Sequence, residues 1–91
     1  MQYLFKVKRM NHDQVYAGML SILSEWYEKN SPYFVPSSEL RAKLNTPVED
    51  LRPYAEELEQ KGYVRKLEGL SPNFIVKFTK QGHRAYKTHA L

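Results

Sequence analysis

The sequence predicts an α+β domain of three helices, a β-hairpin and a closing helix. Apolar residues recur at helical spacing from Val15 to Leu58, and two β-rich runs flank a turn cluster at residues 69–73. Thr79 then offers an N-cap for a last helix. The length of 91 residues suits one domain, residues 1–91, divided into an N-terminal strand or arm over 1–10 and a core over 11–91.

Composition narrows the function classes. The chain has no cysteine, which excludes disulfides and thiolate metal sites. Its three histidines are scattered and expected to face solvent, and no glycine-rich phosphate loop is present. We therefore expect no enzymatic activity, no metal and no cofactor. Neither a signal-peptide core nor an apolar run of spanning length is found, so we expect a cytoplasmic protein without membrane contact.

The first segments are a short strand and a long helix. Residues 3–8 are β-rich and predict a strand, with a basic arm as the alternative. Asn11 or Asp13 can cap a helix that runs to about Lys29. This helix has an apolar face wider than a small core requires. Part of that face, with Trp26 and Tyr27, is a candidate homodimer interface, and ordinary core packing is the alternative.

Residues 30–36 separate this helix from the next. Asn30-Ser31-Pro32 is expected to stop the first helix, and Tyr33-Phe34-Val35 is expected to be extended. After Pro36, either Ser37 or Ser38 is the expected N-cap of the second helix.

Two helices joined by a tight turn are expected over residues 37–62. Leu40 and Leu44 lie one turn apart on the first, and the second carries apolar residues at positions 51, 55 and 58. Between them, Thr46 and Glu49 can form a capping box with Pro47 at the first helical position. Gly62 is expected to end the second helix in the left-handed conformation.

The rest of the chain reads as a hairpin with a loop of about five residues, followed by the helix that Thr79 caps. With the motifs ELRAKL, VEDLRPYAEELEQKGYV and FTKQGHRAY, residues 13–88 resemble the winged-helix (winged helix-turn-helix) superfamily of small bacterial, archaeal and phage-type regulators. The resemblance implies a β-hairpin wing and a short strand beside it near residues 33–35. It also implies binding to double-stranded DNA.

The resemblance further implies which residues contact DNA. Thr46 and Arg52 belong to the helix expected to enter the major groove, where Arg52 would meet a guanine edge or a phosphate. Ser37 and Ser38 would hold a phosphate at a helix N-terminus. The other expected DNA contacts are Arg41 beside that terminus, Arg65, Lys66 and Lys77 on the wing, and Asn73 at its tip.

The charge distribution opens an alternative. Residues 46–60 carry a net charge of −4, which leaves +8 on the remainder of a chain whose net charge is +4. Pro53 removes a backbone donor within this acidic helix and is expected to bend it. Two functions therefore remain open. One is a homodimeric DNA-binding transcription regulator that uses its basic wing. The other is a protein–protein interaction module or adaptor, with an acidic helix and no intrinsic DNA affinity.

Overall fold

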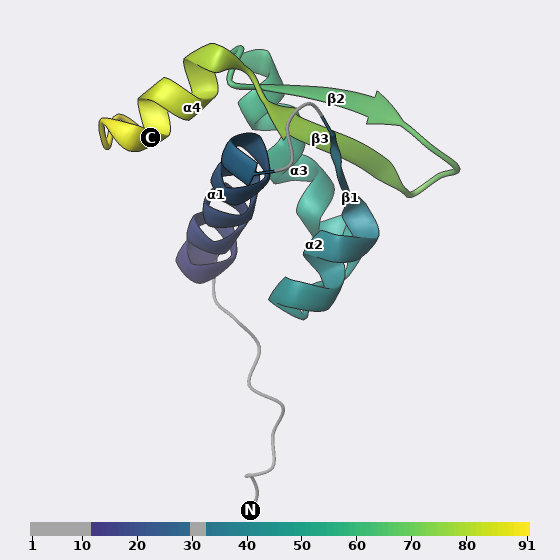
Figure 1. The fold of residues 1–91 in the computed structure, drawn as a ribbon. Coiled ribbons are helices and arrows are strands. Elements are labelled where there is room, and N and C mark those ends of the chain that lie inside the picture. The colour runs from purple at the N-terminus through teal and green to yellow at the C-terminus, as the bar shows by residue number, and fades with distance from the viewer. Residues whose placement is uncertain (1–11, 30–32) are drawn as a thin grey trace, which may run out of the picture.

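The computed structural model describes residues 12–29 and 33–91. The expected strand or arm over residues 1–10, the Asn11 cap and the stop at residues 30–32 lie outside the described residues. Seven elements follow one another along the chain (Figure 1), namely α1 (His12–Lys29), β1 (Val35–Pro36), α2 (Ser37–Leu44), α3 (Val48–Gln60), β2 (Val64–Glu68), β3 (Phe74–Phe78) and α4 (Lys80–Lys87).

The three strands form one antiparallel sheet in the order β1-β3-β2. Strands β2 and β3 are joined through residues 69–73 and extend away from the helices as a wing (Figure 1). Strand β1 pairs with the other edge of β3, with Val35 opposite Val76. The structure thus confirms the α+β class, the hairpin and the short strand beside it.

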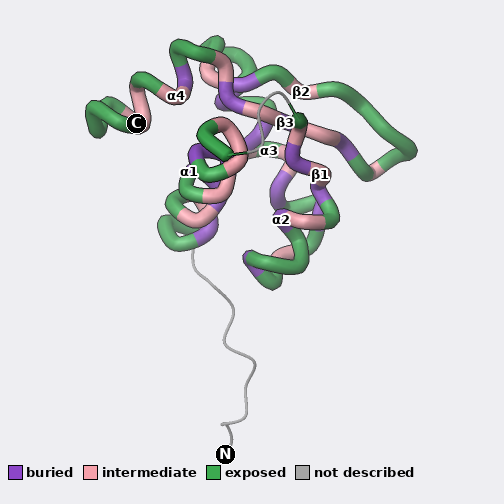
Figure 2. The backbone as a smooth tube through the Cα atoms, in the orientation of Figure 1, coloured by how far each residue is buried: buried purple, intermediate pink, exposed green. Residues whose placement is uncertain are grey.

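The core lies between the helices and one face of the sheet, and Figure 2 marks the buried residues of these elements in purple. On β3 the alternation is complete, because Phe74, Val76 and Phe78 are all buried. On α3 the apolar positions at helical spacing are fully covered. Helix α1 contributes Val15, Met19, Leu20 and Leu23 to this core, and Tyr16, Ile22, Trp26 and Tyr27 pack against its edge half-buried.

Two of the expected helix starts were wrong. The N-cap of α3 is Pro47, whose carbonyl accepts from the Asp50 and Leu51 amides, and no side chain caps this end. The hydroxyl of Thr46 instead donates to the Leu44 carbonyl at 2.8 Å, because Asn45 turns the chain in the left-handed conformation. The capping box therefore does not form, and α3 begins one residue later than expected.

The cap of α2 was also misplaced. Pro36 occupies the N-cap position without a side-chain hydrogen bond, and Ser37 is already the first helical residue. At the start of α1, Asp13 lies in the first turn rather than at the cap. Helix α3 stays continuous across Pro53, and the bend expected there stays a prediction.

The end of α3 and the start of α4 form one junction. Gly62 has a φ of 81°, its amide donates to Glu59, and the Tyr63 amide donates to Leu58, which is the Schellman arrangement expected at a helix end. The Thr79 hydroxyl accepts from the Gly82 amide at 3.0 Å and donates to the Gly62 carbonyl at 2.8 Å. Both expected caps are confirmed.

Within the described residues, no helix is long and apolar enough to cross a membrane.

Candidate nucleic-acid interface

The N-terminus of α2, the middle of α3 and the loop of the wing meet at one place. A pocket of about 210 Å³ lies between the start of α2 and the wing. Ser37, Ser38 and Asn73 line it together, although they come from segments far apart in the sequence. From the other side, Arg52 of α3 reaches the same loop and bonds the Pro72 carbonyl at 2.9 Å. The structure therefore brings four of the predicted site residues to the junction of helix and wing.

Ser37 is used inside the domain. Its side chain is almost fully buried, and its hydroxyl accepts from the Phe74 amide at 3.2 Å and donates to Asn73 Oδ1 at 3.4 Å. These bonds tie the first residue of α2 to the start of β3. Ser38, the next residue, is exposed and leaves its hydroxyl at the surface.

The guanidinium of Arg52 is held by the wing. Its Nη2 donates to both carboxylate oxygens of Glu68, at 2.9 and 3.0 Å, while Nη1 donates to the Pro72 carbonyl. The Glu56 carboxylate lies 3.7 Å away on the same helix, and the guanidinium sits 5.5 Å from the centre of the Phe74 ring. In this structure Arg52 binds the wing to α3.

Lys66 shares the same carboxylate. The side chains of β2 alternate, so Lys66 points to the core side of the sheet, where only 7% of its side chain is exposed and its Nζ contacts Glu68. Hydrogen bonds from Lys66 and from Arg52 hold the pKa of the Glu68 carboxyl below its ordinary value. Two cations predicted to contact DNA thus converge on one anion of the wing.

The outer face of the wing carries the other two cations. Arg65 and Lys77 are directly opposite each other in the β2–β3 ladder. Arg65 is exposed and has no side-chain partner among the described residues, and Lys77 Nζ lies 5.1 Å from the centre of the Phe34 ring.

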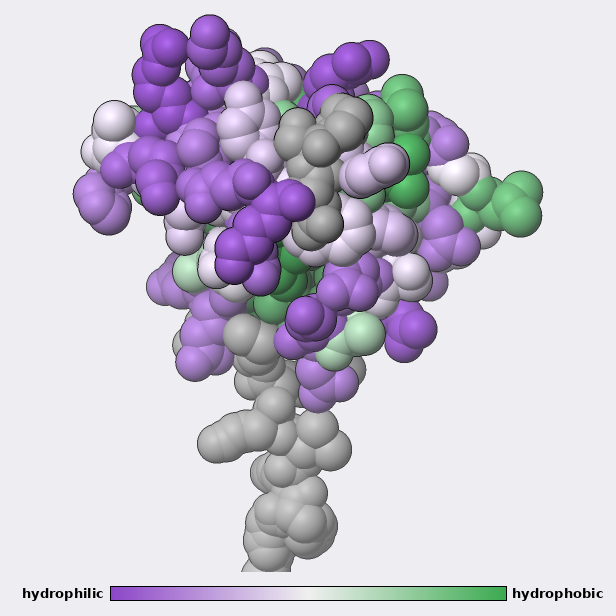
Figure 3. Space-filling view, in the orientation of Figure 1, coloured by the Kyte–Doolittle hydropathy of each residue, from purple (hydrophilic) through white to green (hydrophobic). Residues whose placement is uncertain are grey.

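Hydrophobic surface also lies over the wing in the space-filling view (Figure 3). Leu67 and Leu70 are the large apolar residues exposed in this part of the chain.

The surface of α3 is acidic. Its apolar residues and its single arginine turn to the core and the wing, so the remaining charged side chains face outward. Glu57 is paired with Lys61 at 3.2 Å. Arg41 and Lys43 are exposed on the neighbouring helix α2, and Lys43 lies 3.4 Å from Glu39. The exposed acidic residues of α3 are Glu49, Asp50, Glu56, Glu57 and Glu59.

Helices α1 and α4 are joined by a contact that the sequence did not predict. The His83 ring stacks on Tyr27 with 4.3 Å between ring centres, and its Nε2 lies 2.8 Å from the Glu28 carboxylate. Lys87 reaches the same carboxylate at 3.2 Å. Hydrogen bonds from His83 and Lys87 lower the pKa of Glu28. His83, expected to face solvent, is half-buried, with 21% of its side chain exposed. No local sequence signal indicates this contact, because Glu28 lies 55 positions away.

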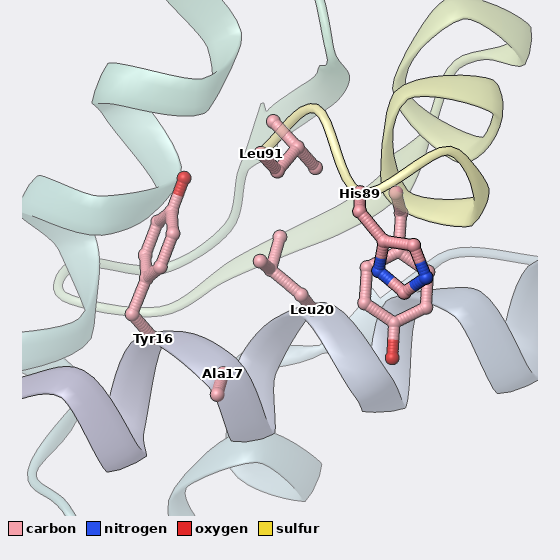
Figure 4. A pocket seen from close by; sticks show the side chains of 6 residues that line it. Tyr16, Ala17, Leu20, His89 and Leu91 are labelled. Atoms are coloured by element: carbon pink, nitrogen blue, oxygen red, sulfur yellow. The ribbon is translucent and has the colours of Figure 1, made fainter.

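A second pocket, of about 260 Å³, lies between α1 and the C-terminal residues (Figure 4). Tyr16, Ala17 and Leu20 form its floor on α1, while His89 and Leu91 approach from the end of the chain. Burial raises the pKa of the Tyr16 hydroxyl. None of the predicted DNA contacts is among the described residues that line this pocket, so it is separate from the junction of helix and wing.

Within the part of the chain that the structure covers, no group of three or more histidines and carboxylates is arranged to hold a metal ion.

Comparison with known proteins places the fold. No protein-family model matches the sequence, and no curated protein matches it. A Ralstonia eutropha JMP134 protein, whose DNA-binding role is a provisional assignment, superposes with a TM-score of 0.73 at 15% identity, covering 87% of this chain and 98% of its own.

Two further structures are similar. An Archaeoglobus fulgidus protein gives a TM-score of 0.62 at 18% identity, over 89% of this chain and 85% of its own. ZitR of Lactococcus lactis gives a TM-score of 0.60 at 14% identity, and the match covers 99% of this chain but only 56% of ZitR. Together with the helix-turn-helix of α2 and α3 and the β2–β3 wing, these matches show that the chain has the winged-helix fold.

Proposed function

We propose that this domain binds double-stranded DNA and acts as a small transcription regulator. The observation that carries the proposal is the pair of cations on the outer face of the wing. Arg65 and Lys77 are cross-strand partners, so both place positive charge on the same face of the wing. Phosphate contacts of such side chains supply much of the affinity for DNA.

Further contacts extend the proposed interface along α2. Arg41 is exposed on this helix, and Ser38 lies at its N-terminus, beside Asn73 of the wing loop. Because Pro36 caps α2 without a side-chain acceptor, the first amides of the helix are available to an anion. Thr46 lies in the turn before α3. We leave Ser37 out of the interface because its hydroxyl is bonded within the domain.

The Ralstonia eutropha protein, with its provisional DNA-binding role, supports this proposal through the shared fold. A regulator of this kind works in the cytoplasm, and we propose that location. We also propose a homodimer, in which Trp26 and neighbouring half-buried residues of α1 contact a second copy, so that two wings reach neighbouring half-sites. One ring face of Tyr27 is already used by His83, so Trp26 carries more of this interface.

A titration of labelled duplex DNA at about 50 and about 200 mM salt tests the DNA proposal. The Arg65→Gln/Lys77→Gln variant should bind about tenfold more weakly. The slope of the logarithm of its binding constant against the logarithm of the salt concentration should also become shallower by about 2. The matched control is Lys80→Gln/Arg84→Gln, which removes the same charge from α4, at the end of the molecule opposite the wing loop (Figure 1). No binding at low salt, or equal losses in both variants, would reject the proposed interface.

The dimer is tested separately by sedimentation velocity. The proposal expects a species of twice the 10.8 kDa chain mass at micromolar concentration. A strictly monomeric species would remove this part of the proposal and leave DNA binding to be judged on its own titration.

The acidic surface of α3 favours a second candidate, an interaction module for a basic protein partner. Its five exposed carboxylates repel phosphates, while its one arginine is held by Glu68. The same titration separates the two functions. An interaction module shows no salt-dependent binding to duplex DNA, and binding to a basic peptide such as polylysine is lost in Glu49→Gln/Asp50→Asn.

A further inference from the structure

Glu68 occupies the groups that DNA phosphates would otherwise bind. Arg52 and Lys66 both point at its carboxylate, and Arg52 offers two hydrogen bonds to it from one nitrogen. We propose that Glu68 is an intramolecular competitor of DNA, which restrains the affinity of the domain by holding Arg52 and Lys66 at the junction of α3 and the wing. This inference rests on the proposed DNA-binding function and adds a residue that sets its strength.

The chemistry of the contact supports competition. A guanidinium binds a carboxylate and a phosphate with the same planar set of donors, so one anion excludes the other. The Glu68 side chain is 55% exposed, and an ion pair at such a site contributes little stability. A phosphate arriving from solvent can therefore displace the carboxylate, but the displaced carboxylate stays close to it, and the repulsion between the two anions lowers the affinity for DNA.

The two cations stay in place when the carboxylate leaves. Arg52 is only 24% exposed, packs over Phe74 and keeps its bond to the Pro72 carbonyl. Lys66 is 7% exposed, so its stem is fixed by the sheet. Removing the charge of Glu68 should therefore leave a preorganised pair of cations between the helix and the wing, with Glu56 still 3.7 Å from Arg52. In the native chain Glu68 offsets one of these two positive charges.

The test is the DNA titration with Glu68→Gln, which keeps an acceptor for Arg52 and removes the charge. We expect about tenfold tighter binding and a salt slope steeper by about 1 to 2, because one or two more phosphates are contacted. The matched control is Glu57→Gln, which removes an exposed carboxylate from its pair with Lys61. Adding Arg52→Gln to Glu68→Gln should abolish the gain if Arg52 is the released group.

A second readout follows the carboxylate itself. In an NMR titration of the wild-type protein, the pKa of Glu68 should lie below its ordinary value of 4.5 without DNA and return toward that value when DNA is bound. The outcomes separate the two proposals. If neither the wild type nor Glu68→Gln binds DNA, the proposed function fails and the competition fails with it. If the wild type binds and Glu68→Gln gains no more than Glu57→Gln, the competition alone is overturned.

Discussion

The Phe74 amide at the start of β3 donates its hydrogen bond to the hydroxyl of Ser37, at 3.2 Å, across 37 positions of the chain. Both residues are buried, so neither group can turn to water instead. The same hydroxyl donates to Asn73, which places the loop of the wing against α2. A serine that looks like a helix cap in the sequence therefore fixes the position of the wing.

Ser37→Ala should destabilise the domain. The substitution leaves the buried Phe74 amide without its acceptor, which costs about 1–3 kcal/mol in the free energy of unfolding. Chemical denaturation monitored by circular dichroism measures this loss. Ser38→Ala is the matched control, because its side chain is exposed, and we expect a change within about 0.5 kcal/mol. Equal effects of the two substitutions would contradict the role given to the Ser37 hydroxyl.

Gly82→Ala should be more damaging. A Cβ on Gly82 would lie 1.9 Å from the Tyr63 carbonyl oxygen, and the Tyr63 carbonyl carbon and Cα are also closer than 3.0 Å. Because these atoms are backbone, α4 must move away from the end of α3, at a cost of about 3 kcal/mol or more. Thermal denaturation compares this variant with Gly69→Ala, where the nearest atom is at 3.5 Å and little change is expected. A Gly82→Ala protein as stable as wild type would show that α4 is not seated against Tyr63.

His83→Ala should loosen α4 from α1. Loss of the ring stack on Tyr27 lowers the free energy of unfolding by about 1 kcal/mol. Lys87→Gln removes only the exposed contact with Glu28, and its effect should stay within about 0.5 kcal/mol. Hydrogen exchange of the α4 amides gives the local measurement. If protection in α4 falls equally in both variants, the charge on Glu28 and not the stack holds the helix.

Stability should fall at acidic pH through two carboxylates. The pKa of Glu28 is lowered by His83 and Lys87, and that of Glu68 by Lys66 and Arg52. A carboxyl with a folded-state pKa below its unfolded value stabilises the fold above that unfolded value, and the contribution is lost as pH falls through the folded pKa. Because the ordinary pKa of both carboxyls is 4.5, their contribution to stability is lost as the pH falls below about that value.

The comparison for this prediction is the Glu28→Gln/Glu68→Gln variant. Its midpoint of urea denaturation should depend less on pH than that of the wild type between about pH 5 and pH 3. A matched variant, Glu25→Gln/Glu59→Gln, removes two exposed carboxylates for which the structure shows no cation partner among the described residues. It should keep the wild-type pH dependence. If both variants lose the pH dependence of the urea midpoint equally, the pH dependence comes from net charge and not from the two ion pairs.

Local sequence signals predicted most of the fold. Gly62 ends α3 because its positive φ suits a residue without Cβ, and Thr79 caps α4 with its own hydroxyl. The helical spacing on α3 predicted its core face correctly. The error at Thr46 arose where two local partners compete, since its hydroxyl could serve the helix end or the Leu44 carbonyl. The error at Ser37 arose because its partner, the Phe74 amide, lies 37 positions further along the chain.

The candidate site could be predicted only in part. Residue type indicates that Arg52, Lys66 and Arg65 are cationic, but it does not say which anion each one meets. Arg52 and Glu68 are 16 positions apart, and their contact depends on how the wing folds back toward α3. Strand alternation puts Arg65 and Lys66 on opposite faces of the sheet, and only its packing decides that Lys66 lies on the core side.

The sequence by itself determined the winged-helix elements, because caps, turns and apolar periodicity act over a few residues of chain. It also determined the acidic character of α3 and the surplus of positive charge elsewhere. Only the tertiary structure decided which of those charges remain available. Arg52 is engaged by Glu68, 16 positions away, because an ion pair between distant segments depends on packing that brings both partners within about 4 Å. Lys66 meets the same carboxylate two positions along its own strand, while Arg65 stays exposed.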